Sequence, residues 1–448
     1  MIKKSAIFIV SAILLTTACR FIFSYDLIPY RDGDKWGYCD ANKKIVIPVN
    51  YEDAGFFREG LAFVKNASVV DVNGITNGGL YGYIDKSGAV IVPFIYNDAY
   101  SFYDSLAGVV SNGKWGFIDR TGRQVVPLTY DYEYAFTNGL AKVNQFGSYD
   151  DKLYAVIGGK WGFIDTNGNV VVPVKYDAAD DFSGGLALVN MGGTFETDRR
   201  DIEGGKWGFV DMKGKVIVQL KYDKANDFKE GLAGVCVNHK GWGFIDTKGR
   251  VVISLKYAEA RDFSEGLAVV AIDTSSASNP LGGHKYGYIN KNGRVTIPIK
   301  YDQAVPFSEG IGCVYTSGNI WAGTASAMFI DKTGRELFTF GTHKGVYPFS
   351  EGFAKIRSKD GNMYYLVDKN GKEVAEYDRI GEFIEGMVWV GKKDPSTGKN
   401  SYGFLNSRGE EAVHTKYEDE FNFEDGLARV EIDGKWGVID TNGNEYWK

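Results

Sequence analysis

The sequence has few cysteines, histidines and prolines for its length of 448 residues. Its four cysteines are too few for a disulfide scaffold. Its four histidines share no metal-ligand spacing with one another or with a cysteine. We therefore expect no metal and no cofactor, and we expect the histidines to lie in solvated loops. No helical period persists for long, which argues against substantial helices.

Basic character is also lacking. The formal net charge is −6, so the chain has no electrostatic footprint for nucleic acid. It contains no G-x-S-x-G motif, phosphate-binding loop, dinucleotide fingerprint or H-E-x-x-H motif, and we expect no enzymatic activity. Glycine, with 57 residues, and aromatic residues, at 15%, are abundant instead. This mixture is typical of short strands joined by tight turns, and it excludes global disorder.

The N-terminus has the three-part layout of a secretory signal. Lys3 and Lys4 precede an apolar run over 6–15, and small residues precede Cys19. The end of this segment resembles the lipobox of bacterial lipoproteins, although Thr16 stands where leucine is preferred. The resemblance implies that 1–18 is a signal peptide and that Cys19 is lipidated as the first residue of the mature chain.

We therefore expect a protein that is anchored by lipid in the cell envelope, outside the cytoplasm. An uncleaved N-terminal anchor and ordinary secretion are the alternatives. Residues 19–34 are predicted to be a linker. If Cys19 is lipidated, Cys39, Cys236 and Cys313 remain, and we expect buried free thiols.

Internal repeats dominate the rest of the chain. The string K-W-G-F-I-D recurs, and tyrosine replaces the tryptophan at Tyr81, Tyr286 and Tyr402. Two degenerate copies at 327–331 and 364–368 bring the array over 35–448 to about eleven units. The motif tryptophans are Trp36, Trp115, Trp161, Trp207, Trp242 and Trp436. The glycine that follows, as in Gly116, Gly162 and Gly208, leaves room for a close neighbour.

Each unit predicts three short strands. W-G-F-I-D is one strand, D-x-x-G is a hairpin turn, and the β-branched run that follows is the return strand. Y-D-x-A-x-x-F-x-E-G is a compact turn whose aromatic rings fill the gap between units, and G-L-A-x-V is the third strand. These motifs resemble the bacterial WG-repeat family across nearly the whole mature chain. The resemblance implies an all-β repeat array in envelope or secreted proteins, and it implies no agreed ligand.

Two architectures are compatible with this array. We favour an open β-solenoid or superhelix, because propellers usually have four to eight blades of four strands each. Propeller-like closure is the alternative. Unit eight is eroded, which allows a break near 318–345.

The irregular segments are the candidate binding elements. Four inserts precede the next W/Y-G, at 66–80, 145–159, 191–205 and 273–283. The motif residues are needed for packing between units, whereas the inserts can vary and can therefore recognise a specific partner. We expect Trp115, Trp161 and Trp207 to be buried between units, and the recurrent Asp and Glu-Gly residues to be structural. The candidate binding residues are Tyr149, Tyr154, Phe195, Arg199 and Arg200.

The function expected from these features is that of a non-catalytic, envelope-anchored scaffold that binds protein partners. The alternative is a module that binds glycan or cell-wall polymer. A glycan binder predicts a groove of exposed tryptophan or tyrosine, whereas a protein scaffold predicts a mixed apolar patch.

Overall fold

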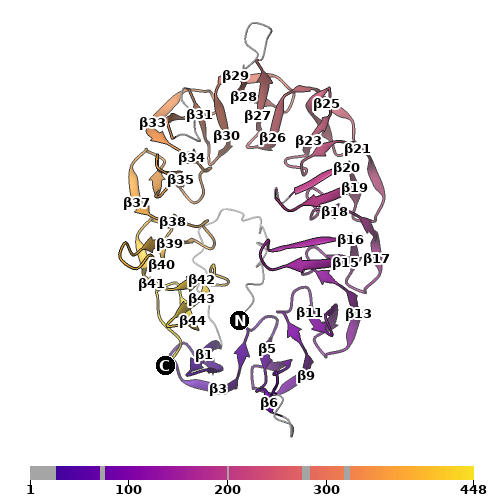
Figure 1. Cartoon of the computed structure of the whole chain (residues 1–448), viewed down its shortest axis with the longest axis vertical. Helices are drawn as coiled ribbons and strands as arrows, with labels where there is room; N and C mark the ends of the chain where they lie inside the picture. The colour runs from indigo at the N-terminus through magenta and orange to yellow at the C-terminus, as the bar shows by residue number, and fades with distance from the viewer. Residues whose placement is uncertain (1–26, 71–75, 199–200, 275–282, 317–322) are drawn as a thin grey trace.

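A computed structural model describes residues 27–448 apart from 71–75, 199–200, 275–282 and 317–322. These residues form eleven antiparallel sheets, the blades, around a wide central opening (Figure 1). The part of the chain that the structure describes contains no helix, and therefore none able to cross a membrane. Cys19, Arg199, Arg200 and the signal segment 1–18 lie outside the described residues.

The all-β repeat architecture is confirmed, and the ring is a closed β-propeller, the alternative that the sequence left open. The preference for an open array is wrong for two physical reasons. Each complete blade has a fourth, short strand inside the segment that was predicted to be a turn, and the last blade contacts the first two. Eleven blades fit one ring because the ring encloses a wide opening (Figure 1).

Most blades have four strands that run in order from the central opening outward (Figure 1). The first strand is only two residues long in eight of these blades, where it consists of the x-A part of Y-D-x-A, and it is six residues long in β26 and β30. The first strands are β4 (Asp53–Ala54), β10 (Asp98–Ala99), β14 (Tyr132–Glu133), β18 (Ala178–Ala179), β22 (Lys224–Ala225), β26 (Glu259–Ser264), β30 (Gln303–Ser308), β34 (Gly345–Val346), β38 (Arg379–Ile380) and β42 (Asp419–Glu420).

The second strand carries L-A-x-V, whose alternate side chains face the two neighbouring blades. The second strands are β1 (Ile28–Asp32), β5 (Leu61–Lys65), β11 (Leu106–Ser111), β15 (Leu140–Asp150), β19 (Leu186–Glu196), β23 (Leu232–Val237), β27 (Leu267–Asp273), β31 (Ile311–Tyr315), β35 (Phe353–Arg357), β39 (Met387–Lys393) and β43 (Leu427–Ile432).

The third strand carries W-G-F-I-D. The third strands are β2 (Lys35–Cys39), β8 (Tyr81–Asp85), β12 (Lys114–Asp119), β16 (Ala155–Asp165), β20 (Asp201–Asp211), β24 (Gly241–Asp246), β28 (His284–Asn290), β32 (Ala325–Ile330), β36 (Tyr364–Asp368), β40 (Asn400–Asn406) and β44 (Lys435–Asp440). A D-x-x-G turn ends most of them: Gly122 has a φ of 82° and donates its N–H to the Asp119 carbonyl oxygen at 2.9 Å.

The fourth strand is the outer edge. The fourth strands are β3 (Ile45–Tyr51), β9 (Val90–Tyr96), β13 (Gln124–Tyr130), β17 (Val170–Tyr176), β21 (Val216–Tyr222), β25 (Val251–Tyr257), β29 (Val295–Tyr301), β33 (Glu336–His343), β37 (Glu373–Tyr377) and β41 (Glu411–Tyr417). The first insert adds a separate pair, β6 (Val69–Val70) and β7 (Thr76–Asn77). Over 318–345, where a break was considered, the described part contributes β32 and β33 to blade 8.

Most core clusters lie between two blades, and the cluster at the ring closure joins blades 11, 1 and 2. Between blades 3 and 4, Phe117 of β12 meets Phe136, which precedes β15, with ring centroids 4.7 Å apart in an edge-to-face arrangement. Tyr130 at the end of β13 is buried in the same cluster. One sequence repeat thus starts on the third strand of one blade and ends on the second strand of the next. The repeat therefore ties adjacent blades together covalently.

The ring closes between blade 11 and blades 1 and 2. Blade 11 ends without a fourth strand, and the C-terminal residues take its place: the Lys448 N–H donates to the Arg31 carbonyl oxygen of β1 at 3.0 Å. Arg58 of blade 2 also forms an ion pair with Glu424 of blade 11 at 2.6 Å. Arg429 of β43 reaches Asp53 of β4 at 3.2 Å.

Candidate interaction surface

Two neighbouring blades have a long hairpin between their second and third strands. In blade 3 the connection between the second and third strands is the two-residue turn 112–113. In blades 4 and 5 the strands β15–β16 and β19–β20 are each eleven residues long. Their extensions, 145–159 and 191–205, are called here the first arm and the second arm. Both extend over the central opening (Figure 1).

In each arm, a buried asparagine side chain forms the same two hydrogen bonds to glycine backbone groups. The side-chain oxygen of Asn144 accepts the Gly147 N–H at 3.0 Å, and its amide donates to the Gly158 carbonyl oxygen at 3.3 Å. Asn190 makes the equivalent bonds to Gly193 and Gly204 at the same distances. Both asparagines are completely buried, so each fixes the bend at which its arm leaves the blade.

A pair of glycines in each arm makes room for this asparagine side chain. Gly158, Gly159, Gly204 and Gly205 all have φ near +70°, and a Cβ on Gly159 or Gly205 would collide with the asparagine oxygen. The sequence prediction missed these asparagines. The signal was present, because both arms share an N-x-x-G segment and a G-G-K-W-G segment.

Exposed apolar side chains follow the arms. Phe146 is 85% exposed, Tyr154 54% and Met191 42%. Of the predicted binding residues, Tyr154 therefore faces solvent, whereas Phe195 is half-buried opposite Ile202 on its own arm. Tyr149 is half-buried and stacks on Tyr132 of β14, with centroids 5.3 Å apart and planes within 6°.

Aromatic rings continue from Tyr149 along the inner part of blades 3 and 4. Tyr132 contacts Trp115 with centroids 5.4 Å apart, and Trp115 contacts Tyr100 at 5.0 Å. Tyr134 contacts Trp161 at 5.8 Å. The structure therefore groups one predicted binding residue, Tyr149, with motif tryptophans that were predicted to be structural.

The motif tryptophans differ in burial. Trp36 and Trp161 are buried, at 5% and 9% exposed. Trp115 and Trp207 are half-buried, although the sequence predicted that both are buried between units, and Trp242 and Trp436 are half-buried as well.

An acidic strip lies at the first strands of blades 5, 6 and 7. It consists of Asp180, Asp181, Asp227 and Asp262, in the segments A-D-D-F, A-N-D-F and A-R-D-F. Burial, with Asp180 adding to it, raises the pKa of Asp227 to about 6, and burial also raises the pKa of Asp262. The Oδ1 atoms of Asp227 and Asp262 are shielded from solvent and accept no hydrogen bond within the described chain. Lys229 is the neighbouring cation.

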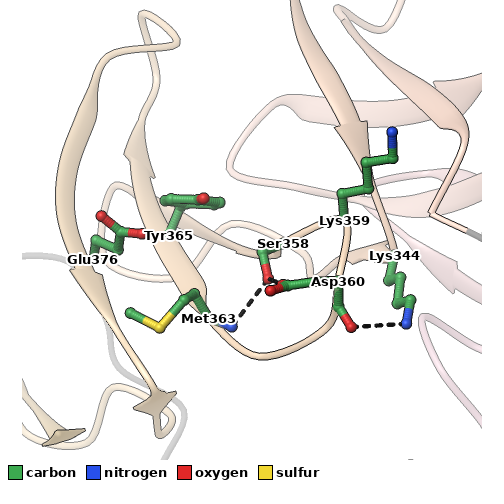
Figure 2. Close-up of a pocket in the computed structure, with 7 residues that line it drawn as sticks. All are labelled: Lys344, Ser358, Lys359, Asp360, Met363, Tyr365 and Glu376. Carbon is green, nitrogen blue, oxygen red and sulfur yellow. Dashed lines mark hydrogen bonds between the residues drawn. The ribbon is translucent and has the colours of Figure 1, made fainter. Parts of the chain in front are cut away.

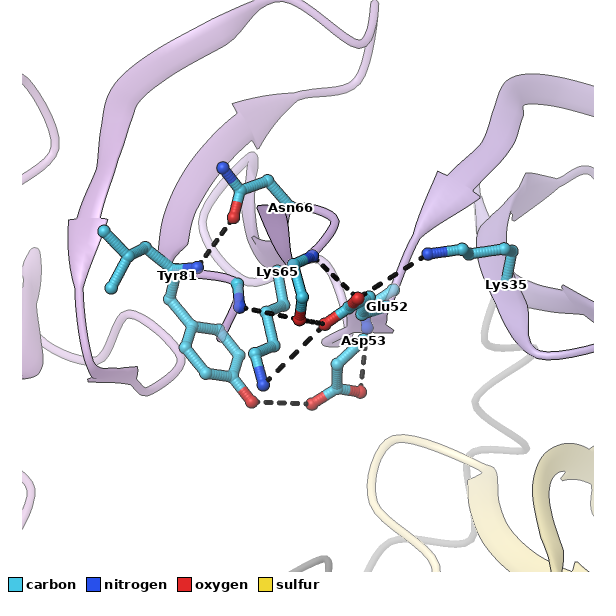
Figure 3. Close-up of polar contacts among 10 residues, drawn as sticks. Lys35, Glu52, Asp53, Lys65, Asn66 and Tyr81 are labelled. Carbon is cyan, nitrogen blue, oxygen red and sulfur yellow. Dashed lines mark hydrogen bonds and ion pairs between the residues drawn. The ribbon is translucent and has the colours of Figure 1, made fainter. Parts of the chain in front are cut away.

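The first insert forms a self-contained polar network (Figure 3). Glu52 accepts hydrogen bonds from the N–H and hydroxyl groups of Ser68 at 2.8 and 3.0 Å and lies 3.7 Å from the Lys35 ammonium. Asp53 accepts a bond from the Tyr81 hydroxyl at 3.2 Å. The same pairing of the K-W-G lysine with the acidic residue after the motif tyrosine recurs in other blades, as in Lys114–Asp131 at 2.5 Å. These charges are satisfied within the repeat, so we assign them a structural role.

A shallow cavity of about 570 Å³ lies at blade 9 (Figure 2). Its lining includes three departures from the motif: Lys344 for the Y-D aspartate, Met363 for the K-W-G lysine and Tyr365 for its glycine. Lys344 donates to the Asp360 carbonyl oxygen at 2.9 Å (Figure 2). The preceding residue, His343, is completely buried against Tyr315, which corrects the expectation of a solvated loop histidine.

The cysteines and the carboxylates of the Glu-Gly turns have structural roles in the described residues. In the described residues, Cys39, Cys236 and Cys313 are free and buried, and no group of three potential metal ligands is present. The carboxylates of the Glu-Gly turns join neighbouring blades: Glu230 accepts the Gly266 N–H at 3.0 Å, and Glu309 accepts the Gly352 N–H at 3.0 Å.

The repeated segments match the model of a known protein family. The family model described as "WG containing repeat" matches nine segments that together cover more than half of the chain: 36–67, 81–115, 115–149, 161–195, 207–240, 242–273, 286–319, 366–394 and 402–436. No curated protein matches the sequence.

The solved structures that match this chain share little sequence with it. A eukaryotic initiation factor is 11% identical, with a TM-score of 0.44, over 76% of this chain and 94% of that one. BamB from Moraxella catarrhalis is 12% identical, with a TM-score of 0.28, over 76% and 93%. The WD40 β-propeller domain of Doa1 is 14% identical, with a TM-score of 0.27, over 70% and 90%. The nine matching segments of the family model show that the chain belongs to the WG containing repeat family.

Proposed function

We propose that this propeller is a non-catalytic scaffold that binds a protein partner through the two arms. The observation that carries the proposal is the pair of arms itself. Two adjacent blades use the same buried asparagine and glycine pair to hold long hairpins at a fixed bend, while blade 3 closes the same connection with two residues. The arms place Phe146, Tyr154 and Met191 in solvent, where an apolar partner surface can cover them.

Burial favours a protein partner over the glycan alternative. A sugar ring needs an open aromatic face, whereas Trp161 is buried and Trp115 packs between Tyr100 and Tyr132. The exposed residues of the arms mix aromatic, aliphatic and charged side chains, which is the composition of a protein interface.

Photo-crosslinking tests the arms directly. We expect a photoreactive amino acid at Tyr154 or Phe146 to yield a discrete crosslinked species in cells. The matched control is Ile95 on the outer strand β9, which is 55% exposed, as Tyr154 nearly is. Crosslinking from Ile95 equal to that from the arms, or none from the arms, contradicts the proposal.

A trimmed variant supplies the second control. Residues 146–159 are replaced by the Asn-Gly turn of 112–113, because Gln145 pairs with Lys160 as Ser111 pairs with Lys114 on either side of that turn in blade 3. The fold is expected to persist, and the crosslinked species from the second arm is expected to weaken.

We also propose that the scaffold is anchored in the cell envelope through a lipid on Cys19. The support is the charged start, the apolar run and the small residues before this cysteine. Palmitate labelling of the wild type and of Cys19→Ala tests this: the variant should lose the label, and equal labelling would overturn the lipid anchor.

A further inference from the structure

We infer that one end of the propeller lies on an anionic lipid surface, and that the two arms leave the ring at the end away from the membrane. The lipid-facing end is called here the turn face. It consists of the turns that follow the third strands, 40–44, 85–89, 119–123, 165–169, 211–215, 246–250, 290–294, 331–335, 368–372, 406–410 and 440–444. The inference rests in part on the proposed envelope anchor, and it names the side of the ring that meets the lipid.

The turns form one continuous row around the ring. From blade 2 to blade 11, each turn packs against the outer strand of the preceding blade. A Cβ added to Gly249 of blade 6 would lie 3.1 Å from Val218 of β21, and one added to Gly293 of blade 7 would lie 3.3 Å from Ile253 of β25. The turns of successive blades are therefore neighbours in space, on the outer part of the ring where β21, β25 and β29 lie (Figure 1).

The turn face concentrates positive charge in an acidic protein. Its turns contain sixteen lysines and arginines against ten aspartates and glutamates, whereas the whole chain has 51 against 57. The side chains of Lys213, Lys248 and Arg294, in three adjacent blades, are exposed and form no ion pair within the described chain. These cations are therefore available to an anionic surface outside the protein.

The carboxylates close to these cations are already satisfied by the fold. In blade 5, Asp211 accepts the backbone N–H groups of Lys213 and Lys215, both at 2.9 Å. The glutamates of the adjacent Glu-Gly turns pair with other turn cations, as Glu230 does with Lys291 at 3.0 Å. The positive charge of the row is therefore only partly neutralised within the chain.

Exposed aliphatic side chains gather at the same end of the blades. Sixteen large apolar side chains of the described chain are exposed, and ten of them lie in these turns or in the two residues that follow. They are Ile45, Val46, Val90, Ile91, Val170, Met212, Val251, Val252, Val295 and Leu337. A soluble anion gains nothing from such side chains, whereas the interface of a bilayer accepts cations and apolar groups together. The mixture therefore favours a lipid surface over a soluble polyanion.

The first strand of the ring also starts at the turn face. Ile28 at the start of β1 pairs with Cys39, which directly precedes the turn 40–44. Cys19 is eight residues before Leu27, and eight residues span at most about 29 Å. A lipid on Cys19 would therefore hold this end of the ring close to the bilayer.

The arms leave the blades at the opposite end. In blade 4, Leu140 of β15 pairs with Asp165 at the turn, whereas Asp150 at the other end of β15 pairs with Ala155 in the first arm. A ring that rests on its turn face therefore keeps the arms accessible to a protein partner.

Vesicle flotation with the purified full-length chain tests the inference. The parent protein is Cys19→Ala, so that binding does not depend on a covalent lipid. The probes are vesicles of phosphatidylglycerol mixed with phosphatidylcholine, vesicles of phosphatidylcholine alone, and soluble polyphosphate. The charge variant adds Lys213→Glu, Lys248→Glu and Arg294→Glu to the parent.

The matched control reverses three other exposed lysines of the same blades. It adds Lys221→Glu, Lys256→Glu and Lys300→Glu, at the far end of the outer strands β21, β25 and β29. Both triple variants change the net charge equally and keep the apolar N-terminal segment. A difference between them therefore reports on the turn face alone.

We expect the parent to bind the anionic vesicles more tightly than the neutral ones. The charge variant should bind the anionic vesicles on the order of tenfold more weakly, and the control should bind them as the parent does. Equal weakening in the two triple variants, or no preference of the parent for anionic vesicles, overturns the inference.

An aliphatic variant separates a lipid surface from a soluble anion. Val251→Ser with Val252→Ser removes two exposed aliphatic side chains and no charge. We expect it to weaken vesicle binding on the order of threefold and to leave polyphosphate binding unchanged. If this variant binds vesicles as the parent does, while the charge variant loses polyphosphate, the turn face binds a soluble anion and the inference falls.

The inference and the proposed anchor fail separately. If Cys19 takes no palmitate label but the turn face binds anionic vesicles, the lipid anchor falls and the inference stands on the charges and aliphatic side chains. If Cys19 is labelled but the two triple variants bind vesicles alike, the inference falls and the anchor stands.

Discussion

Gly116 of β12 faces the carbonyl oxygen of Val126 of β13 so closely that an added Cβ would lie 2.6 Å from that oxygen. The cause is a bulge. Trp115 pairs with Tyr130 and Phe117 pairs with Val126, so Gly116 alone opposes three residues of the outer strand. Blades 8 and 9 carry Met328 and Tyr365 at this position, and there the two strands pair residue for residue, Met328 with Thr339 and Tyr365 with Glu376.

The first prediction concerns this glycine. Gly116→Ala should destabilise the protein by about 1–3 kcal/mol, because the methyl group can be accommodated only if the bulge moves. Urea denaturation followed by tryptophan fluorescence measures the change. The matched control is Gly341→Ala in β33, where an added Cβ meets no atom within 4 Å. Equal stability of the two variants would show that the bulge is not what requires the glycine.

A second prediction concerns Lys142, whose ammonium joins the aromatic rings of its own blade to Asp181 of the next. Lys142→Met should cost about 1–2 kcal/mol, because the rings of Tyr134 and Trp161 lose their cation and the exposed Asp181 loses its partner, while the aliphatic packing is kept. Lys175→Met is the control, since its ammonium lies 5.3 Å from the Tyr176 ring but the side chain is exposed. A loss in Lys175→Met as large as in Lys142→Met would contradict a specific role for the inter-blade contact.

The features that repeat could be predicted from the sequence, because each repeated residue has the same local structural role in every unit. The W-G strand, the D-x-x-G turn and the inter-unit packing of the Y-D-x-A-x-x-F segment follow from turn chemistry and alternation, and the structure confirms them. The two-residue first strand could not be read, because Asp98–Ala99 is too short to show a period.

The closure of the ring could not be predicted from the motif for a different reason. It depends on Arg58, Arg429 and the C-terminal residues, each of which occurs once and has no repeated pattern. The position of the arms was predicted from insert length. Their shared bend was not, because it rests on Asn144 and Asn190, which lie just before the inserts rather than inside them.

A third prediction uses Glu133, which stands in β14 where most blades have alanine and fills the space over Gly108 of blade 3. Burial raises the pKa of this carboxyl to about 8. Because the folded pKa exceeds the unfolded value near 4.5, the folded state binds the extra proton between these limits. Its contribution is therefore complete below about pH 4.5 and is lost as the pH rises through about 8.

Glu133→Gln should remove this dependence. We expect the wild type to lose on the order of a few kcal/mol between pH 5 and pH 9 relative to the variant, with the two most alike at pH 5. Urea midpoints at both pH values measure the difference. Parallel pH profiles for the two proteins would mean that Glu133 does not carry a raised pKa.

The last prediction concerns ring closure by Trp447. Its ring lies against Gly437 of β44, where the other W-G glycines meet an outer strand, and its backbone pairs with Arg31 of β1. Trp447→Ala should therefore remove both the packing that replaces the fourth strand and the anchor for the pairing with blade 1. We expect a loss of about 3–5 kcal/mol, and a larger radius of gyration by small-angle X-ray scattering if the ring opens. Deleting Lys448 alone is the control, because it removes one hydrogen bond to Arg31 and leaves the indole in place. If Trp447→Ala matched this control in stability and scattering, then Arg58–Glu424 and Arg429–Asp53 would be sufficient to hold the ring closed.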